Sequence, residues 1–304
     1  MSSVQAPLWG HHSLLLNLPT GGVRFAGLSP AQLTSLNRCY ARFTCTDTAT
    51  PADTIECLAV QLTSPLQIDP QALAADGLYT PLKVRCETGI ELTGINFQAQ
   101  IPVGSTPGQA RLGVALEHEF AQPNVVENFL RVLAAHRGLE LGGAVLHSAG
   151  LVFEGQAYIF AGRSNAGKTT LTRKAHSAGA TVLSDDINLV LPQAGGYRAY
   201  AVPFTGEFGR TVDHDQTEAS YPVAGIVLLE QAQRLAATQV SAANAVARLM
   251  VGCPFVNTDE NETNTLFDNL AEMVAQLPVI QLQNRREDPI SEIMTTVRGA
   301  LSYG

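Results

Sequence analysis

The residues from Gly162 to Thr170, Gly-Arg-Ser-Asn-Ala-Gly-Lys-Thr-Thr, constrain the fold of this chain more than any other stretch. They fit the pattern of a phosphate-binding loop, in which two glycines with four residues between them are followed by lysine and a hydroxyl residue. We expect Gly162 and Gly167 to take left-handed conformations that turn successive N–H groups inward on a phosphate. Lys168 would bring a positive charge to the outer phosphates, and the Thr169 hydroxyl would ligate Mg²⁺.

The residues around this loop predict a strand before it and a helix after it. The run 157–161 is short and apolar, which is typical of a buried strand. Residues 168–178 have apolar side chains at helical spacing, and Gly179 is suited to end the helix. The helix dipole would then favour an anion at its N-terminus. We therefore expect the whole loop to contact a bound nucleotide: Gly162, Arg163, Ser164, Asn165, Ala166, Gly167, Lys168, Thr169 and Thr170.

Length, charge and cysteine content narrow the class of protein. The 304 residues allow one large domain or two ordinary ones. The net charge of −8, without a Lys/Arg cluster, argues against nucleic acid as a partner. We find neither an apolar run long enough for a membrane nor a signal-peptide pattern, so we expect a cytoplasmic protein with no membrane partner. The five cysteines form no Cys-x-x-Cys pair, which indicates reduced thiols and no zinc site.

The sequence pattern changes near residue 120, where we expect a domain boundary. Residues 1–120 are predicted to form a small α+β domain whose role the sequence does not state, and residues 121–304 a second domain. The first has predicted strands at 13–18, 22–25, 55–62, 82–87 and 91–101, and a helix beginning at Ser29-Pro30. The second has predicted helices at 124–137, 168–178, 241–250, 263–276 and 288–301, and predicted strands at 144–146, 151–153, 157–161, 181–191, 197–202, 223–229 and 279–282.

Two further features of the second domain are expected near the loop. A buried strand runs directly into His147, and a hairpin then returns the chain to the strand that enters the loop. Asp185 and Asp186 interrupt the apolar run 181–191. A nucleotide site needs a carboxylate to hold its Mg²⁺, and a kinase needs one to accept the proton of the attacking hydroxyl. The loop, the two acids and His147 together predict phosphoryl transfer.

Strand geometry leaves open which of the two aspartates faces the loop. Neighbouring residues of a regular strand point to opposite faces, so Asp185 and Asp186 cannot both face a nucleotide equally. A bulge or a strand end at this position would let both contribute. Two carboxylates in an apolar run are costly to bury without a counter-charge, which Lys168 and Mg²⁺ would supply.

With these motifs, the second domain resembles the catalytic domain of the HPr serine kinase/phosphorylase family, and more closely the HPr-kinase-related proteins outside sugar regulation. The resemblance covers roughly residues 125–304. It rests on the strand that ends at His147, the loop and the aspartate pair. In that family the matching residues line the active site. The resemblance implies catalytic roles for His147, Lys168, Asp185 and Asp186, with Asp185 as the base toward a serine hydroxyl and Asp186 as the supporting acid.

The resemblance also implies a fold and cofactors. The family's domain is similar to ATP-dependent phosphoenolpyruvate carboxykinase: an α/β fold of the α+β type, with the phosphate loop in mixed β-structure flanked by helices, and not a doubly wound parallel sheet. Its members use ATP and Mg²⁺, and the metal lies between the loop hydroxyl and an acidic residue. The matching metal ligands are Thr169 and Asp186. Glu207, in a Gly-rich loop over 203–210, is a further candidate ligand.

Several departures separate this chain from HPr kinases proper. Asn165 stands where they have glycine, and Thr169-Thr170 where they have serine followed by glutamate. We find no Glu-Ile-Arg-Gly signature, which in the family is tied to the phosphorylase reaction, and the stretch 203–207 is a candidate local replacement. We therefore expect kinase chemistry without the reverse reaction, and an acceptor other than HPr.

The leading hypothesis is an ATP- and Mg²⁺-dependent kinase that acts on a serine or similar hydroxyl of a protein or ribosomal peptide. Some related kinases phosphorylate ribosomal peptide natural products, which favours a peptide acceptor. Two alternatives stay open: a small-molecule kinase with the same site, and a non-catalytic nucleotide-binding regulatory module. The family forms hexamers through this domain, so a homo-oligomer is a further expectation, although no motif specifies it.

Overall fold

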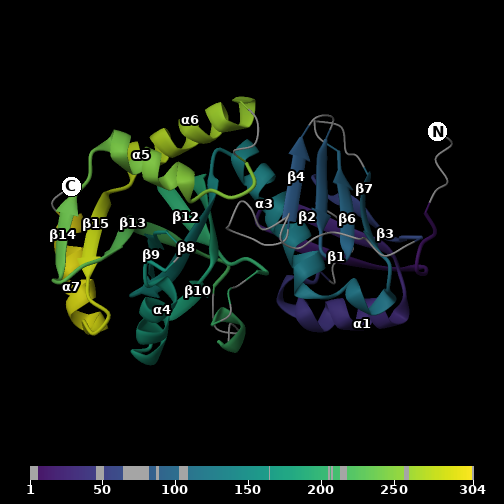
Figure 1. The fold of residues 1–304 in the computed structure, drawn as a ribbon, viewed down its shortest axis with the longest axis horizontal. Helices are drawn as coiled ribbons and strands as arrows, with labels where there is room; N and C mark the ends of the chain where they lie inside the picture. The colour runs from purple at the N-terminus through teal and green to yellow at the C-terminus, as the bar shows by residue number, and fades with distance from the viewer. Residues whose placement is uncertain are drawn as a thin grey trace. The chain divides into compact units, whose positions relative to one another are not determined.

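The computed structural model describes residues 6–45, 51–63, 82–86, 89–102, 109–163, 165–204, 206, 208–212, 218–256 and 260–302. These residues form a mixed α/β structure with β-sheets and several helices (Figure 1). Residue contacts divide the chain into two units, Met1–Leu133 and Ala134–Gly304. The division falls inside helix α3, Asn128–Glu140, and so lies later in the chain than the boundary expected near residue 120. None of the described helices is both long and apolar enough to cross a membrane.

The first unit is built on a sheet with the strand order β1-β2-β3-β7-β6-β5-β4. Strand β3 pairs in parallel with β2 and β7, and the other neighbours are antiparallel. Helix α1, Pro30–Cys39, begins where predicted, because the Ser29 and Gln32 side chains accept each other's backbone N–H. The strands are β1 His12–Leu18, β2 Gly21–Leu28, β3 Ile55–Gln61, β4 Leu82–Cys86, β5 Ile90–Gly94, β6 Phe97–Ile101 and β7 Gln109–Val114.

The prediction of one strand over 91–101 is wrong. Asn96 takes a left-handed conformation (φ 65°) and turns the chain between β5 and β6. Asparagine tolerates this conformation better than most non-glycine residues, so the turn forms inside an otherwise strand-like run. Strand β7 has no counterpart in the sequence prediction, since Ala110 and Gly113 weaken its strand propensity.

The second unit is built on a mixed sheet with the order β10-β8-β11-β12-β13-β15-β14, and β9 lies against both β8 and β13. The pairs β8–β11, β11–β12, β12–β13, β13–β9 and β9–β8 close a ring of strands. The ring closes because the long strands β8 and β13 change partners along their length. The strands are β8 Ala144–Phe153, β9 Gln156–Ala161, β10 Thr181–Ser184, β11 Ile187–Gln193, β12 Gly196–Tyr200, β13 Ser220–Gln231, β14 Ala236–Gln239 and β15 Val279–Asn284.

The helices of this unit are α4 Lys168–Ser177, α5 Ala242–Val251, α6 Glu260–Gln276 and α7 Ile290–Leu301 (Figure 1). Leu171 of α4 and Ile293 of α7 are buried in one apolar cluster with Phe160 of β9 and Val227 of β13. Helices α4 and α7 therefore cover the same face of the sheet. The predicted N-cap of α5 is confirmed, because the Ser241 hydroxyl accepts the N–H of Asn244. Strand β14 has no counterpart in the sequence prediction.

The predicted strand over 181–191 is broken at Asp185-Asp186 into β10 and β11. Both parts pair with β8 in antiparallel fashion, with Ser184 opposite Gly150 and Ile187 opposite His147. The pairing also slips between Val182 and Ser184. A strand end therefore lies at the two aspartates, and it positions them beside the strand that carries His147.

Candidate active site

The predicted phosphate loop connects β9 to α4. Gly167 caps the N-terminus of α4 in a left-handed conformation (φ 99°), as expected from the sequence. Gly162 does not take a left-handed conformation, so that expectation is wrong. A Cβ at Gly162 would instead lie 2.9 Å from the Cβ of Ala166 and 3.2 Å from the Cβ of Leu229 on β13. Glycine is required there because the loop packs closely against the sheet.

Asn165 occupies a second left-handed position in the loop (φ 66°). Asparagine is one of the few non-glycine residues that adopt this conformation readily, so the loop keeps a suitable residue where the resembled family has glycine. The Asn165 carbonyl accepts a hydrogen bond from the Gln231 side chain at 2.7 Å, which ties the loop to the end of β13. Arg163 and Thr169 are exposed, and Ser164 lies outside the described residues.

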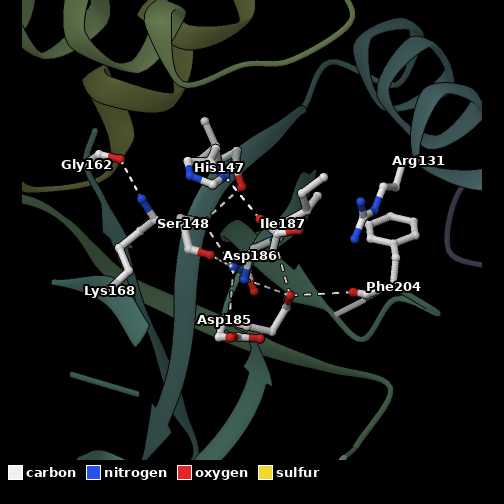
Figure 2. Close-up of polar contacts among 12 residues, drawn as sticks. Arg131, His147, Ser148, Gly162, Lys168, Asp185, Asp186, Ile187 and Phe204 are labelled. Carbon is white, nitrogen blue, oxygen red and sulfur yellow. Dashed lines mark hydrogen bonds and ion pairs between the residues drawn. The ribbon is translucent and has the colours of Figure 1, made fainter. Parts of the chain in front are cut away.

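Lys168 opens α4 and folds back over the loop. Its Nζ donates to the carbonyl oxygens of Gly162 at 2.8 Å and Arg163 at 3.1 Å, and the first of these bonds is drawn in Figure 2. Burial lowers the pKa of Lys168 to about 8, while the negative charge of Asp186 acts in the opposite direction. The ammonium therefore interacts with the loop and, electrostatically, with one of the two aspartates.

Asp186 is the aspartate that lies beside His147. Its Oδ1 is 3.3 Å from Nδ1 of His147, and both side chains remain partly exposed, at 19% and 13% (Figure 2). The strands are joined at the same point, because the Ser148 N–H donates to the Asp186 carbonyl at 2.9 Å. The His147 N–H donates to the Gly252 carbonyl at 2.7 Å, at the end of α5. The backbone of the pair is thus held from both sides while its side chains stay accessible.

Asp185 points away from this pair. Its carboxylate accepts the N–H groups of Phe208 at 3.2 Å and Gly209 at 2.9 Å, in the loop after β12. A Cβ on Gly206 would lie 2.6 Å from Asp185 Oδ1, so the loop approaches as closely as glycine permits. Figure 2 shows the two aspartate carboxylates pointing apart. The alternation expected of neighbouring strand residues is therefore kept at the break between β10 and β11.

Comparison with known proteins gives a family for the chain. The family model described as "SynChlorMet cassette protein ScmC" matches residues 124–287, which is more than half of the chain. The chain belongs to the ScmC family. The matched stretch of this ScmC-family chain includes His147, the phosphate loop and both aspartates.

Among solved structures, the HPr(Ser) kinase/phosphatase from Coxiella burnetii is similar to the ScmC-family chain at 14% sequence identity and a TM-score of 0.32. The match covers 51% of this chain and 94% of that one. No curated protein matches the chain.

Sequence reasoning missed a buried polar layer beneath the two aspartates of the ScmC-family chain. Ser148, Ser184 and Asn188 are all fully buried in the sheet. A signal for two of them was available, since Ser184 and Asn188 stand close to the aspartates in an otherwise apolar run. Buried polar groups in such a run need hydrogen-bond partners, which predicts a local network.

A second missed feature is the contact between the 206–212 loop and α4. The Phe208 ring packs against the guanidinium group of Arg173 at 5.5 Å and edge-on to the His176 ring at 5.8 Å. Cation–π contacts of this kind are worth about 0.5–1 kcal/mol at exposed sites. Phe208 therefore holds the loop on α4 from one side, while Asp185 holds its backbone from the other.

The first turn of α4 offers an oxygen donor of the kind that a nucleotide-bound Mg²⁺ uses. Among the described residues, no group of three or more His, Cys, Asp or Glu side chains could hold a metal ion. Mg²⁺ in nucleotide sites keeps several waters and phosphate oxygens, so it needs few protein ligands. The Thr169 hydroxyl, exposed on the first turn of α4, is a suitable oxygen ligand. Asp186, the second predicted ligand, has its carboxylate paired with His147, and Glu207, the third, lies outside the described residues.

Proposed function

We propose that this ScmC-family chain is an ATP- and Mg²⁺-dependent kinase that transfers the γ-phosphate to a serine or similar hydroxyl of a protein or ribosomal peptide. One observation supports this proposal most directly. The Asp186 carboxylate is paired with His147 at 3.3 Å and acts electrostatically on Lys168, the lysine of the phosphate loop. A phosphate loop alone fits many nucleotide-binding proteins, whereas an acid and a histidine paired near its lysine favour proton transfer at the acceptor.

The nucleotide side of the proposed site consists of residues 162–170 and the start of α4. The N–H groups and the dipole of a helix N-terminus favour the phosphates of ATP. Lys168 would contribute a compact positive charge to the outer phosphates. Bound Mg²⁺ would neutralise part of the phosphate charge, and the Thr169 hydroxyl and Glu207 are its proposed protein ligands.

On the acceptor side we assign the role of general base to Asp186. The proton of the acceptor hydroxyl would move to the Asp186 carboxylate as the hydroxyl oxygen bonds to the γ-phosphorus and the bond to the β–γ bridging oxygen breaks. His147 would orient that carboxylate through its Nδ1. Asp185, the base implied by the resemblance, already accepts two backbone N–H groups. We therefore propose Asp185 as a positioning residue for the 206–212 loop.

Transfer of labelled phosphate tests the class of reaction. The purified chain is incubated with γ-labelled ATP and Mg²⁺, in one reaction with a peptide pool and in another with a metabolite pool. We expect label on serine in the peptide fraction, and its loss in Lys168→Ala, which lacks the loop charge. Lys174→Ala is the matched control, because Lys174 lies on the same helix and donates to carbonyl oxygens of the turn before α7.

The other outcomes of this experiment contradict the proposal. Label in the metabolite pool alone would identify a small-molecule kinase with the same loop. Tight ATP binding with no labelled acceptor in either pool would identify a regulatory nucleotide-binding module. Equal labelling by wild type and Lys168→Ala would show that the loop does not bind the reacting nucleotide.

A further inference from the structure

A hydroxyl group organises the backbone at the point where β10 ends. The Ser184 Oγ accepts the N–H groups of Asp186 and Ile187, both at 3.2 Å. The Ser184 hydroxyl donates in turn to the carbonyl oxygen of Phe204, with 3.5 Å between the two oxygen atoms. A serine side chain that binds N–H groups two and three residues later offers the backbone an alternative to the strand ladder. The break in the strand therefore has a side-chain cause, and that cause is Ser184.

The same buried layer links the aspartates to the strand of His147. The Asn188 Nδ2 donates to the Ser148 carbonyl at 2.7 Å and to the Ser148 Oγ at 3.0 Å. The N–H of Ser148 donates in turn to the Asp186 carbonyl. Ser148 directly follows His147, and Asn188 lies two residues after Asp186. The network thus fixes the backbone next to both members of the His147–Asp186 pair.

We propose that Ser184 is a positioning residue of the phosphoryl-transfer site, which acts by holding the strand break that points Asp186 toward His147 and Asp185 toward the 206–212 loop. This inference rests on the proposed function and extends it to a residue that is fully buried. Without the Ser184 hydroxyl, the N–H groups of Asp186 and Ile187 lose the hydrogen bonds that they donate to its oxygen. The backbone then moves toward a regular strand, and the Asp186 carboxylate turns away from Nδ1 of His147.

The first test is kinetic and uses Ser184→Ala. Because a misplacement of about 1 Å at a reacting group can lower a rate by about 100-fold, we expect kcat to fall by about 10-fold or more. We expect the KM for ATP to stay within about twofold of wild type, since the phosphate loop is untouched. Ser184→Thr keeps a hydroxyl at the same position and should recover part of the rate.

A double variant separates positioning from a merely structural role. If Ser184 acts through Asp186, then Ser184→Ala adds no further loss of rate in an Asp186→Asn background. Ser29→Ala is the matched control, because it removes another buried hydroxyl that accepts a backbone N–H, at the start of α1. We expect this control to lose stability and keep kcat. An equal loss from Ser184→Ala with and without Asp186 would overturn the proposal.

Two measurements need no phosphate-accepting substrate, so they remain informative if the proposed function fails. We expect Ser184→Ala to speed hydrogen exchange at the amides of Asp186 and Ile187, and its crystal structure to lack the His147–Asp186 contact. Unchanged protection of both amides, or a contact kept near 3.3 Å, would overturn the inference whatever the protein catalyses. If Ser184→Ala does not fold, Ser184→Cys, with a similar size and a weaker acceptor, serves the same two measurements.

Discussion

At the scale of single residues, Asn165 shows how a residue that differs from the glycine of HPr kinases can keep the local backbone conformation. It stands in the left-handed region at φ 66°, where glycine is the usual residue. We expect Asn165→Gly to bind ATP within about threefold of wild type. Asn165→Val should bind ATP at least tenfold more weakly, because a β-branched residue is strained in this region. Titration with ATP measures both, and equal binding by the two variants would contradict the argument.

Lys168 gives a prediction about pH. Burial lowers its pKa from 10.5 to about 8, so the ammonium loses its proton as pH rises through 8. We expect ATP affinity to fall about tenfold between pH 7 and pH 9, because phosphate binding favours the charged form. Without ATP, the unfolded lysine binds more protons between pH 8 and 10.5, so stability rises with pH in that window.

Lys168→Arg is the control for this pH dependence. A guanidinium group stays charged throughout the range, so its ATP affinity should be lower overall and flat from pH 7 to pH 9. Calorimetric titration of both proteins at several pH values makes the comparison. The same fall in wild type and Lys168→Arg would assign the pH dependence to another group.

At the scale of elements, the 206–212 loop lies against the break between β10 and β11 through a close contact of Gly206 with Asp185. A Cβ on Gly206 would lie 2.6–2.7 Å from the carboxylate atoms of Asp185, which two backbone N–H groups hold in place. We expect Gly206→Ala to lower the free energy of unfolding by about 1–3 kcal/mol, as overpacking usually does. Gly299→Ala is the contrast, because nothing lies within 4 Å of its Cβ position on α7 and alanine favours helix.

Urea unfolding distinguishes these two glycines. Gly299→Ala should raise the free energy of unfolding by about 0.5–1 kcal/mol, the usual difference between glycine and alanine in a helix. Equal effects of the two substitutions would mean that the contact between Asp185 and the loop does not restrict residue 206.

The elements that the sequence predicted best are those with local signals. The strand before the phosphate loop, helix α4 and the capped starts of α1 and α5 depend on apolar spacing and on residues such as Ser29, Ser241 and Gly167. At 185–186 the sequence left open a regular strand, a bulge or a strand end. It could not decide among them, because the strand end depends on hydrogen bonds to the Ser184 hydroxyl that form only in the folded chain. The direction of each aspartate depends on partners about twenty or more residues away in either direction, such as Gly209 and His147. No local pattern encodes such partners.

At the scale of the whole molecule, the topology explains why the candidate site lies where it does. In the second unit, β8 pairs with β11 up to His147 and with β9 from Ser148 onward. The chain after β9 enters the phosphate loop, and the chain before β11 holds the aspartates. One long strand therefore brings together a loop, a histidine and an acid that the sequence separates by up to about forty residues.

The transfer rate of Asp186→Asn, at saturating ATP and with a peptide acceptor, tests the central claim most directly. A general base contributes about 100-fold to 10,000-fold to a rate, so we expect kcat to fall by at least about 100-fold while the protein still binds ATP. Asp268→Asn, which removes the same charge from an exposed position on α6, should match wild type. Transfer by Asp186→Asn at the wild-type rate would contradict the assignment of the base and the site built around it.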